Sequence, residues 1–114
     1  MKNKFKLIVN NNFHKKEKFF VKKEFQSILN LYARKVSSGD WKDYGLSINK
    51  KEITFDIYQR ASEKPVYRIS KNLNPKNKTE KFYVLDRNGR IVKKSENLDS
   101  LISKIEWTKL KLVR

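Results

Sequence analysis

An apolar stripe with the period of an α-helix dominates the first half of the chain. Its members recur every third or fourth residue, as one buried face of a helix requires. They are Phe25, Ile28, Leu29, Tyr32 and Val36, and Leu31 widens the face. Ser37-Ser38-Gly39 ends the pattern, and Gly39 suits the left-handed position that follows many helices. The sequence therefore predicts an amphipathic helix that packs this stripe into a core.

The chain after this helix has the twofold alternation and the turn signals of β-strands. The clearest strand places Ile53, Phe55 and Ile57 on one face, with polar residues between them. Asn88-Gly89 is a strong hairpin signal because both residues tolerate a positive φ. The predicted strands cover residues 46–48, 53–60, 66–70, 82–85 and 91–92.

A second helical pattern closes the chain, with Leu98, Leu101, Ile102 and Ile105 at helical spacing and Ser95 or Asn97 as the N-cap. The order of elements predicts an α+β fold: an N-terminal helix, an antiparallel meander of four or five strands and a C-terminal helix. Both helices are expected on one face of the sheet, since the alternating strands have one apolar face to cover.

The length of 114 residues fits one domain, because two would each have too small a core. We expect residues 1–18 to form a basic flexible arm and residues 19–114 to form the single domain. Trp41 and Tyr44 follow the first helix and are expected to close the edge of the core. The alternative for this pair is a stacking or partner-binding platform on the surface.

Two sequence blocks stand out: ILNLYARKV at 28–36 followed by GDWKDY at 39–44, and RASEKPVYRI at 60–69. Together they resemble the signature of a small uncharacterised family of alphaproteobacterial proteins, catalogued as a domain of unknown function. The resemblance covers about residues 19–113, and the Lys/Asn-rich segments at 1–18 and 72–79 depart from it. It implies the extent of the domain and a cytoplasmic bacterial setting, but no activity.

The composition argues against several functional classes. The chain has no cysteine and one histidine, His14, which removes thiolate chemistry and leaves no partner for a catalytic triad or a metal site. No pair of carboxylates has a spacing that forces convergence, and the three glycines are scattered. We therefore expect no enzyme and no cofactor. With no segment approaching a membrane span, we expect a cytoplasmic protein without membrane contact.

Positive charge is the one strong functional lead. The formal net charge is +16, and residues 1–23 and 71–94 carry +7 and +6 of it. Such blocks attract polyanions, and phosphate contacts release counterions. We predict nucleic-acid binding, to DNA or structured RNA, with weak sequence preference. The predicted binding residues are Lys15, Lys16, Lys18, Tyr58, Arg60, Arg68, Lys76, Lys78, Lys81, Arg87, Arg90, Lys93 and Lys94.

A protein-interaction module is the alternative function. Arg60, Ser62, Glu63 and Arg68 surround the turn at Pro65 and suit a contact with an acidic partner or with a second copy of the chain. Lysine exceeds arginine by 22 to 6, so part of the charge also fits compositional drift in an AT-rich gene. Salt separates the two functions, because affinity for nucleic acid falls steeply with salt. The oligomeric state stays open.

Overall fold

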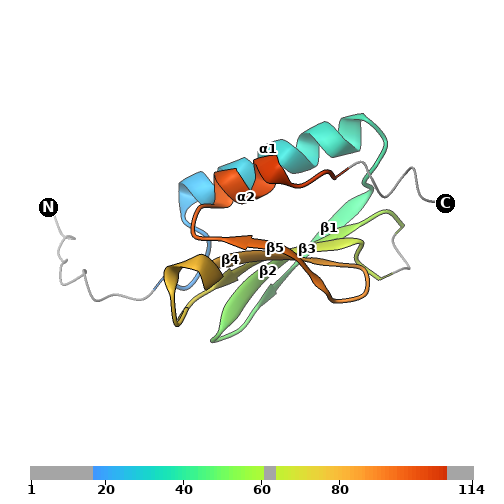
Figure 1. Cartoon of the computed structure of the whole chain (residues 1–114). Helices are drawn as coiled ribbons and strands as arrows, with labels where there is room; N and C mark the ends of the chain where they lie inside the picture. Colours follow the sequence, from blue (N-terminus) through green and yellow to red (C-terminus); the bar gives the residue numbers. More distant parts are fainter. Residues whose placement is uncertain (1–16, 61–63, 108–114) are drawn as a thin grey trace, which may run out of the picture.

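The computed structural model describes residues 17–60 and 64–107, in which two α-helices cover one face of a five-stranded antiparallel sheet (Figure 1). The strands lie in chain order, β1-β2-β3-β4-β5, so the sheet is a meander and the predicted α+β fold is confirmed. The elements are α1 (Lys22–Ser37), β1 (Asp43–Ile48), β2 (Glu52–Tyr58), β3 (Tyr67–Asn72), the 3₁₀ helix η2 (Lys78–Glu80), β4 (Phe82–Asp86), β5 (Ile91–Ser95) and α2 (Leu98–Lys104).

Helix α1 lies on the sheet through a face slightly rotated from the predicted stripe. Ile28 and Leu31 are fully buried, whereas Val36 is 41% exposed. The helix starts where the Glu24 carboxylate accepts the backbone N–H of Val21 at 2.8 Å. It ends at Ser37, and Gly39, which follows the C-cap Ser38, has the φ of +85° expected of the left-handed position there. Val36, in the last turn of α1, was therefore wrongly assigned to the core, because the buried face of the helix runs through Ile28 and Leu31.

Phe55 in β2 is the centre of the core on the helix side. Its ring is fully buried. Phe25 and Tyr32 of α1 meet it edge-on, with ring centroids 6.3 and 5.9 Å away. Tyr44 of β1 stacks on it at 4.8 Å with only 4° between the planes. The alternation of Ile53, Phe55 and Ile57 thus faces the helices as predicted.

Two tryptophans close the end of the core beside the C-terminal ends of α1 and α2. Trp41 and Trp107 are both buried, and their rings meet edge-on at 5.7 Å. The indole N–H of Trp107 donates to the carbonyl of Ile102 at 3.0 Å. Trp41 therefore has the structural role expected for it, and Trp107 joins the core although it falls off the stripe of α2.

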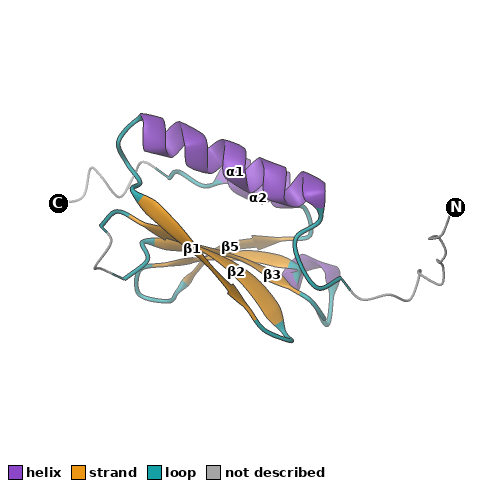
Figure 2. Ribbon diagram, turned by 180° about the vertical axis from the view of Figure 1, so that it is seen from behind, coloured by secondary structure: helices purple, strands orange, loops and turns teal. Residues whose placement is uncertain are grey.

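The second helix packs beside the first on the same side of the sheet (Figure 2). Asn97 is its N-cap, since its side chain accepts the N–H of Ser100 at 2.8 Å. The hydroxyl of Ser27 in α1 donates to the carboxylate of Asp99 in α2 at 2.6 Å. The two helices thus start close together, beside the start of β4.

Four of the observed strands are longer than predicted, whereas β2 ends at Tyr58 instead of residue 60. β1 begins at Asp43 instead of residue 46, β3 extends to Asn72, and β5 extends to Ser95. Backbone pairing continues through polar residues because the ladder needs only N–H and carbonyl groups. The hairpin at Asn88-Gly89 is present, with Gly89 at φ +80°.

Truncation of two residues on α1 tests the rotated face. Leu31→Ala should lower the free energy of unfolding by about 2–5 kcal/mol, because it leaves a cavity in a fully buried site. Val36→Ala should cost less than about 1 kcal/mol, since the side chain already contacts water. Urea unfolding followed by circular dichroism measures both. Equal losses would contradict the rotation.

Candidate nucleic-acid interface

The loop between β3 and β4 is held to its neighbours by backbone hydrogen bonds. Leu73 N–H donates to the carbonyl of Lys51 at 2.8 Å, which ties the loop to the turn between β1 and β2. Asn72 N–H donates to the carbonyl of Lys81 at 2.7 Å and closes the loop at its base. η2 lies within it. The lysines of this segment are therefore carried by a defined loop conformation.

Three of the predicted binding residues, Lys76, Lys78 and Lys81, line one open cavity of about 510 Å³ formed by this loop. We call this the lysine-loop cavity. Lys76 and Lys78 are exposed, and the Lys81 ammonium lies 5.5 Å from the centre of the Phe82 ring. The remaining lining residues are Glu17, Asn72, Leu73, Pro75 and Asn77. Three ammonium groups beside one carboxylate favour an anionic ligand.

Lys71, at the base of the loop, is an internal cation. Its side chain is 1% exposed, and it lies on the helix side of the sheet opposite Ile53. Its ammonium lies 2.6 Å from Glu17 Oε1 and 2.8 Å from Glu24 Oε1, and donates to the carbonyl of Phe19 at 3.2 Å. The hydrogen bond from Lys71 lowers the pKa of Glu17. This contact joins the segment before α1 to the wall of the lysine-loop cavity.

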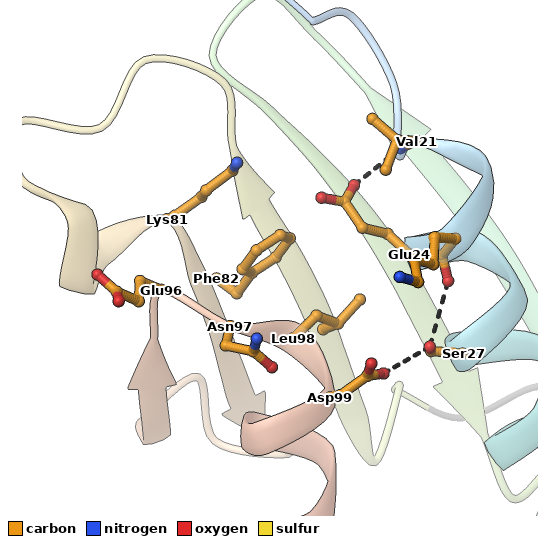
Figure 3. A pocket seen from close by; sticks show the side chains of 10 residues that line it. Val21, Glu24, Ser27, Lys81, Phe82, Glu96, Asn97, Leu98 and Asp99 are labelled. Carbon is orange, nitrogen blue, oxygen red and sulfur yellow. Dashed lines mark hydrogen bonds between the residues drawn. The ribbon is translucent and has the colours of Figure 1, made fainter.

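Lys81 also lines a second cavity of about 240 Å³, between the starts of α1 and α2 (Figure 3). Its charged lining residues are Lys23, Lys81, Glu24, Glu96 and Asp99. Glu24 and Asp99 already accept hydrogen bonds from Val21 and Ser27, the pairs that Figure 3 joins by dashed lines. With three carboxylates against two ammonium groups, this cavity does not suit a phosphate.

The face of the sheet away from the helices is a network of paired polar groups. Arg68 Nε lies 3.2 Å from Asp56 Oδ1, directly across β2 and β3. Asp56 is only 6% exposed and also accepts the Ser47 hydroxyl at 3.2 Å. Burial raises the pKa of Asp56, although Arg68 and Ser47 act in the opposite direction. Arg68, a predicted binding residue, thus has an acidic partner within the sheet.

The other predicted residues do not join the lysine-loop cavity. Tyr58 ends β2 and Arg60 follows it, and Arg87 and Arg90 lie in the β4–β5 hairpin, all at the opposite end of the sheet. One strand of five residues separates the two ends by roughly 17 Å. Lys93 and Lys94 lie on the edge strand β5, and both are exposed.

Most of the predicted arm, residues 1–16, lies outside the described residues. Lys15 and Lys16 lie outside the described residues, whereas Lys18 is exposed next to Glu17. The structure thus assembles Lys76, Lys78 and Lys81 and separates them from the arginines. The pairing of the strands places the lysines and the arginines at opposite ends of the sheet, and no local motif in the sequence indicates this separation.

The fold and the surface define a small basic α+β protein with a lysine-lined loop at one end of its sheet. The chain belongs to the family described as "Protein of unknown function (DUF2794)", whose model matches residues 18–102. The sequence resemblance to an uncharacterised family is thereby confirmed. Neither the curated proteins nor the solved structures contain a match.

The described residues, 17–60 and 64–107, contain no group of three or more histidine, cysteine, aspartate or glutamate side chains arranged to hold a metal ion. Within these ranges, no helix has the length and apolar character needed to cross a membrane.

Lys71 and an exposed lysine of the same loop provide a matched pair of substitutions. Lys71→Met should lower the free energy of unfolding by about 2–3 kcal/mol, because it leaves Glu24 without its cation; the loss is below that of a fully buried pair because Glu17 is half exposed. Lys78→Met should change stability by less than about 0.5 kcal/mol. Urea unfolding at neutral pH measures both. An unchanged free energy of unfolding in Lys71→Met would show that the ion pair of Lys71 and Glu24 does not stabilise the fold.

Tyr83 links stability to alkaline pH. Burial raises its pKa to about 12, and the hydrogen bond that its hydroxyl donates to Glu52 adds to the rise. The fold therefore favours the neutral phenol, and this contribution is complete below pH 10, the ordinary tyrosine value, and is lost as pH rises to about 12. Unfolding free energies measured at about pH 9 and 11 should differ less in Tyr83→Phe than in the wild type. An unchanged difference would contradict this assignment.

Proposed function

We propose that the protein binds nucleic acid, DNA or structured RNA, with weak sequence preference through the lysine-loop cavity. The observation that carries the proposal is the gathering of Lys76, Lys78 and Lys81 around one open cavity on a tethered loop. Lysine ammonium groups on flexible stems neutralise phosphates and release their counterions. The proposal places this activity in the bacterial cytoplasm.

Neighbouring segments extend the positive surface at this end of the sheet. Lys50 and Lys51 lie in the β1–β2 turn, which the Leu73 hydrogen bond joins to the loop, and both are exposed. Lys18 lies beside Glu17, which lines the cavity. A phosphate backbone that crosses the loop would thus meet cations from three segments of the chain.

The lining also supports weak sequence preference. Base readout needs planar side chains for stacking or fixed hydrogen-bonding groups that match base edges. The aromatic residue beside Lys81, Phe82, is buried beneath the surface, and Leu73 and Pro75 are the apolar residues of the cavity. The contacts offered are mainly ammonium groups, which hold phosphates without reading sequence.

Two triple variants with the same loss of charge test the proposal. Lys76, Lys78 and Lys81 are changed to glutamine in the first, and Lys64, Arg87 and Arg90, exposed cations at the opposite end, in the control. Fluorescence anisotropy with labelled duplex DNA and hairpin RNA is measured across salt concentrations. The first variant should reduce the slope of log affinity against log salt by about 2–3, since about 0.9 is lost for each phosphate contact on duplex DNA.

The control variant should keep the wild-type slope. Equal reductions in the two variants would show that net charge acts without a local interface, which contradicts the proposal. No binding at low salt, where electrostatic contacts are strongest, would exclude nucleic acid as the ligand. A protein-interaction module, which binds an acidic partner or a second copy of the chain, would then be the preferred function.

A further inference from the structure

The two edges of the sheet differ in their protection against pairing with another strand. β5 carries the exposed Lys93 and Lys94 and pairs with β4 through a register shift at Val84/Leu85. Lysines and bulges are the features that keep an edge strand from joining another sheet. β1 pairs with β2 in continuous register over six residues, and no charged residue lies between Tyr44 and Ile48. Among the described elements, β1 is the edge open to pairing.

The backbone of β1 presents three residues toward this open side. Asn49 N–H donates to the carbonyl of Glu52 at 3.0 Å, and hydrogen-bonded pairs alternate along an antiparallel ladder. Gly45 and Ser47 therefore bond to β2, while the N–H and carbonyl groups of Tyr44, Leu46 and Ile48 point away from it. Consistent with this, the N–H of Tyr44 donates to the carboxylate of Asp43, at 2.8 Å, and not to β2.

The side chains of the same three residues form an exposed apolar row on the helix side. Tyr44, Leu46 and Ile48 are 43, 40 and 58% exposed and lie opposite the buried Ile57, Phe55 and Ile53. On α1, Tyr32 contacts the ring of Tyr44, and the exposed Val36 lies one turn beyond Tyr32. Four of the seven exposed large apolar residues of the described chain thus belong to β1 or to the end of α1.

We propose that β1 pairs antiparallel with β1 of a second copy of this chain, centred on Leu46. In this register Leu46 lies opposite the partner's Leu46, and Tyr44 lies opposite the partner's Ile48. All three outward-pointing residues of each copy then form backbone pairs, and the apolar rows meet on the same side of one continuous sheet. The contact is isologous, so it closes as a twofold dimer.

The apolar and small residues around Leu46 fit a second copy of the same strand. The sequence is symmetrical in character about this residue, with the small Gly45 and Ser47 on either side and Tyr44 and Ile48 beyond them. An acidic partner strand would instead be held by the flanking Lys42, Lys50 and Lys51. In the dimer these lysines repel one another, so the pairing relies on its apolar and backbone contacts.

This arrangement fixes the strength and the salt dependence of the dimer. A single pair of short strands with four partly exposed apolar side chains per copy is smaller than a standard interface of about 800 Å² per partner. We therefore expect a weak dimer with a dissociation constant on the order of 100 µM. Salt screens the flanking lysines and should strengthen the dimer, whereas it weakens nucleic-acid binding. The dimer goes beyond the proposed function, and either can fail without the other.

A single-cysteine variant traps the pairing directly. The chain has no cysteine, so a disulfide in Leu46→Cys forms only between two copies. Paired residues of an antiparallel ladder have Cα atoms about 5.5 Å apart, within the range that a disulfide spans. Ile91→Cys, 57% exposed on the opposite edge, is the matched control. Oxidation by oxidised glutathione is followed on non-reducing gels at low and high salt.

Leu46→Cys should form the covalent dimer at least about tenfold faster than Ile91→Cys, and faster still at high salt. Sedimentation velocity of the unmodified chain should show dimer increasing with concentration, and Leu46→Lys should remain monomeric with an unchanged circular dichroism spectrum. Equal oxidation rates, or a monomer at about 1 mM, ten times the expected dissociation constant, would overturn the proposal. Loss of the dimer on deletion of residues 1–16 would overturn it as well, since the arm would then supply the partner strand.

Discussion

The ammonium group of Lys71 imposes the constraint on which the loop end of the molecule depends. It lies on the helix side of the sheet, 1% exposed, where an unpaired charge would cost several kcal/mol. Glu24 in the first turn of α1, Glu17 and the carbonyl of Phe19 meet it there. Each of these groups lies at or before the start of α1. The pairing of Lys71 therefore fixes where the chain enters the helix, directly above the end of β3.

This constraint also decides which positive charges are available on the surface. Lys71 belongs to the basic block at 71–94, but its charge is balanced inside the protein. Arg68, whose side chain is about half exposed, pairs with the buried Asp56 on the other face of the sheet. Lys76 and Lys78 extend from the loop that begins directly after β3, and both are exposed. Within the block at 71–94, Lys76, Lys78 and Lys81 thus gather at the lysine-loop cavity, whereas Arg87, Arg90, Lys93 and Lys94 are exposed away from it.

Local patterns were sufficient to predict the elements. The apolar periodicity located both helices and the strands, and Gly39, Asn88-Gly89 and Asn97 marked a helix end, a hairpin and a helix start. These signals act over a few residues, so one sequence contains them in full.

The candidate site depended on information of a different kind. A lysine after an alternating strand is typical of a surface, so the burial of Lys71 becomes visible only once Glu17 and Glu24 are placed beside it. The ion pair of Asp56 and Arg68 needs the register of β2 and β3. The gathering of three lysines, and their separation from Arg87 and Arg90, needs the topology of the meander. Such contacts form between segments that are distant in the sequence, and the local periodicity of apolar residues does not predict them.

The proposed dimer and the proposed binding surface are geometrically compatible. The lysine-loop cavity lies at the Ile48 end of β1, because the turn after β1 is bonded to the loop through Lys51. A twofold axis at Leu46 reverses the strand direction of the second copy and places its Ile48 end beside Tyr44 of the first. The two cavities would then lie at opposite ends of the paired strands. This separation reduces the repulsion between the two lysine clusters, since the Debye length at physiological ionic strength is about 8 Å. A dimer of this form would present its cations as two separate contacts to one long polyanion or to two short ones.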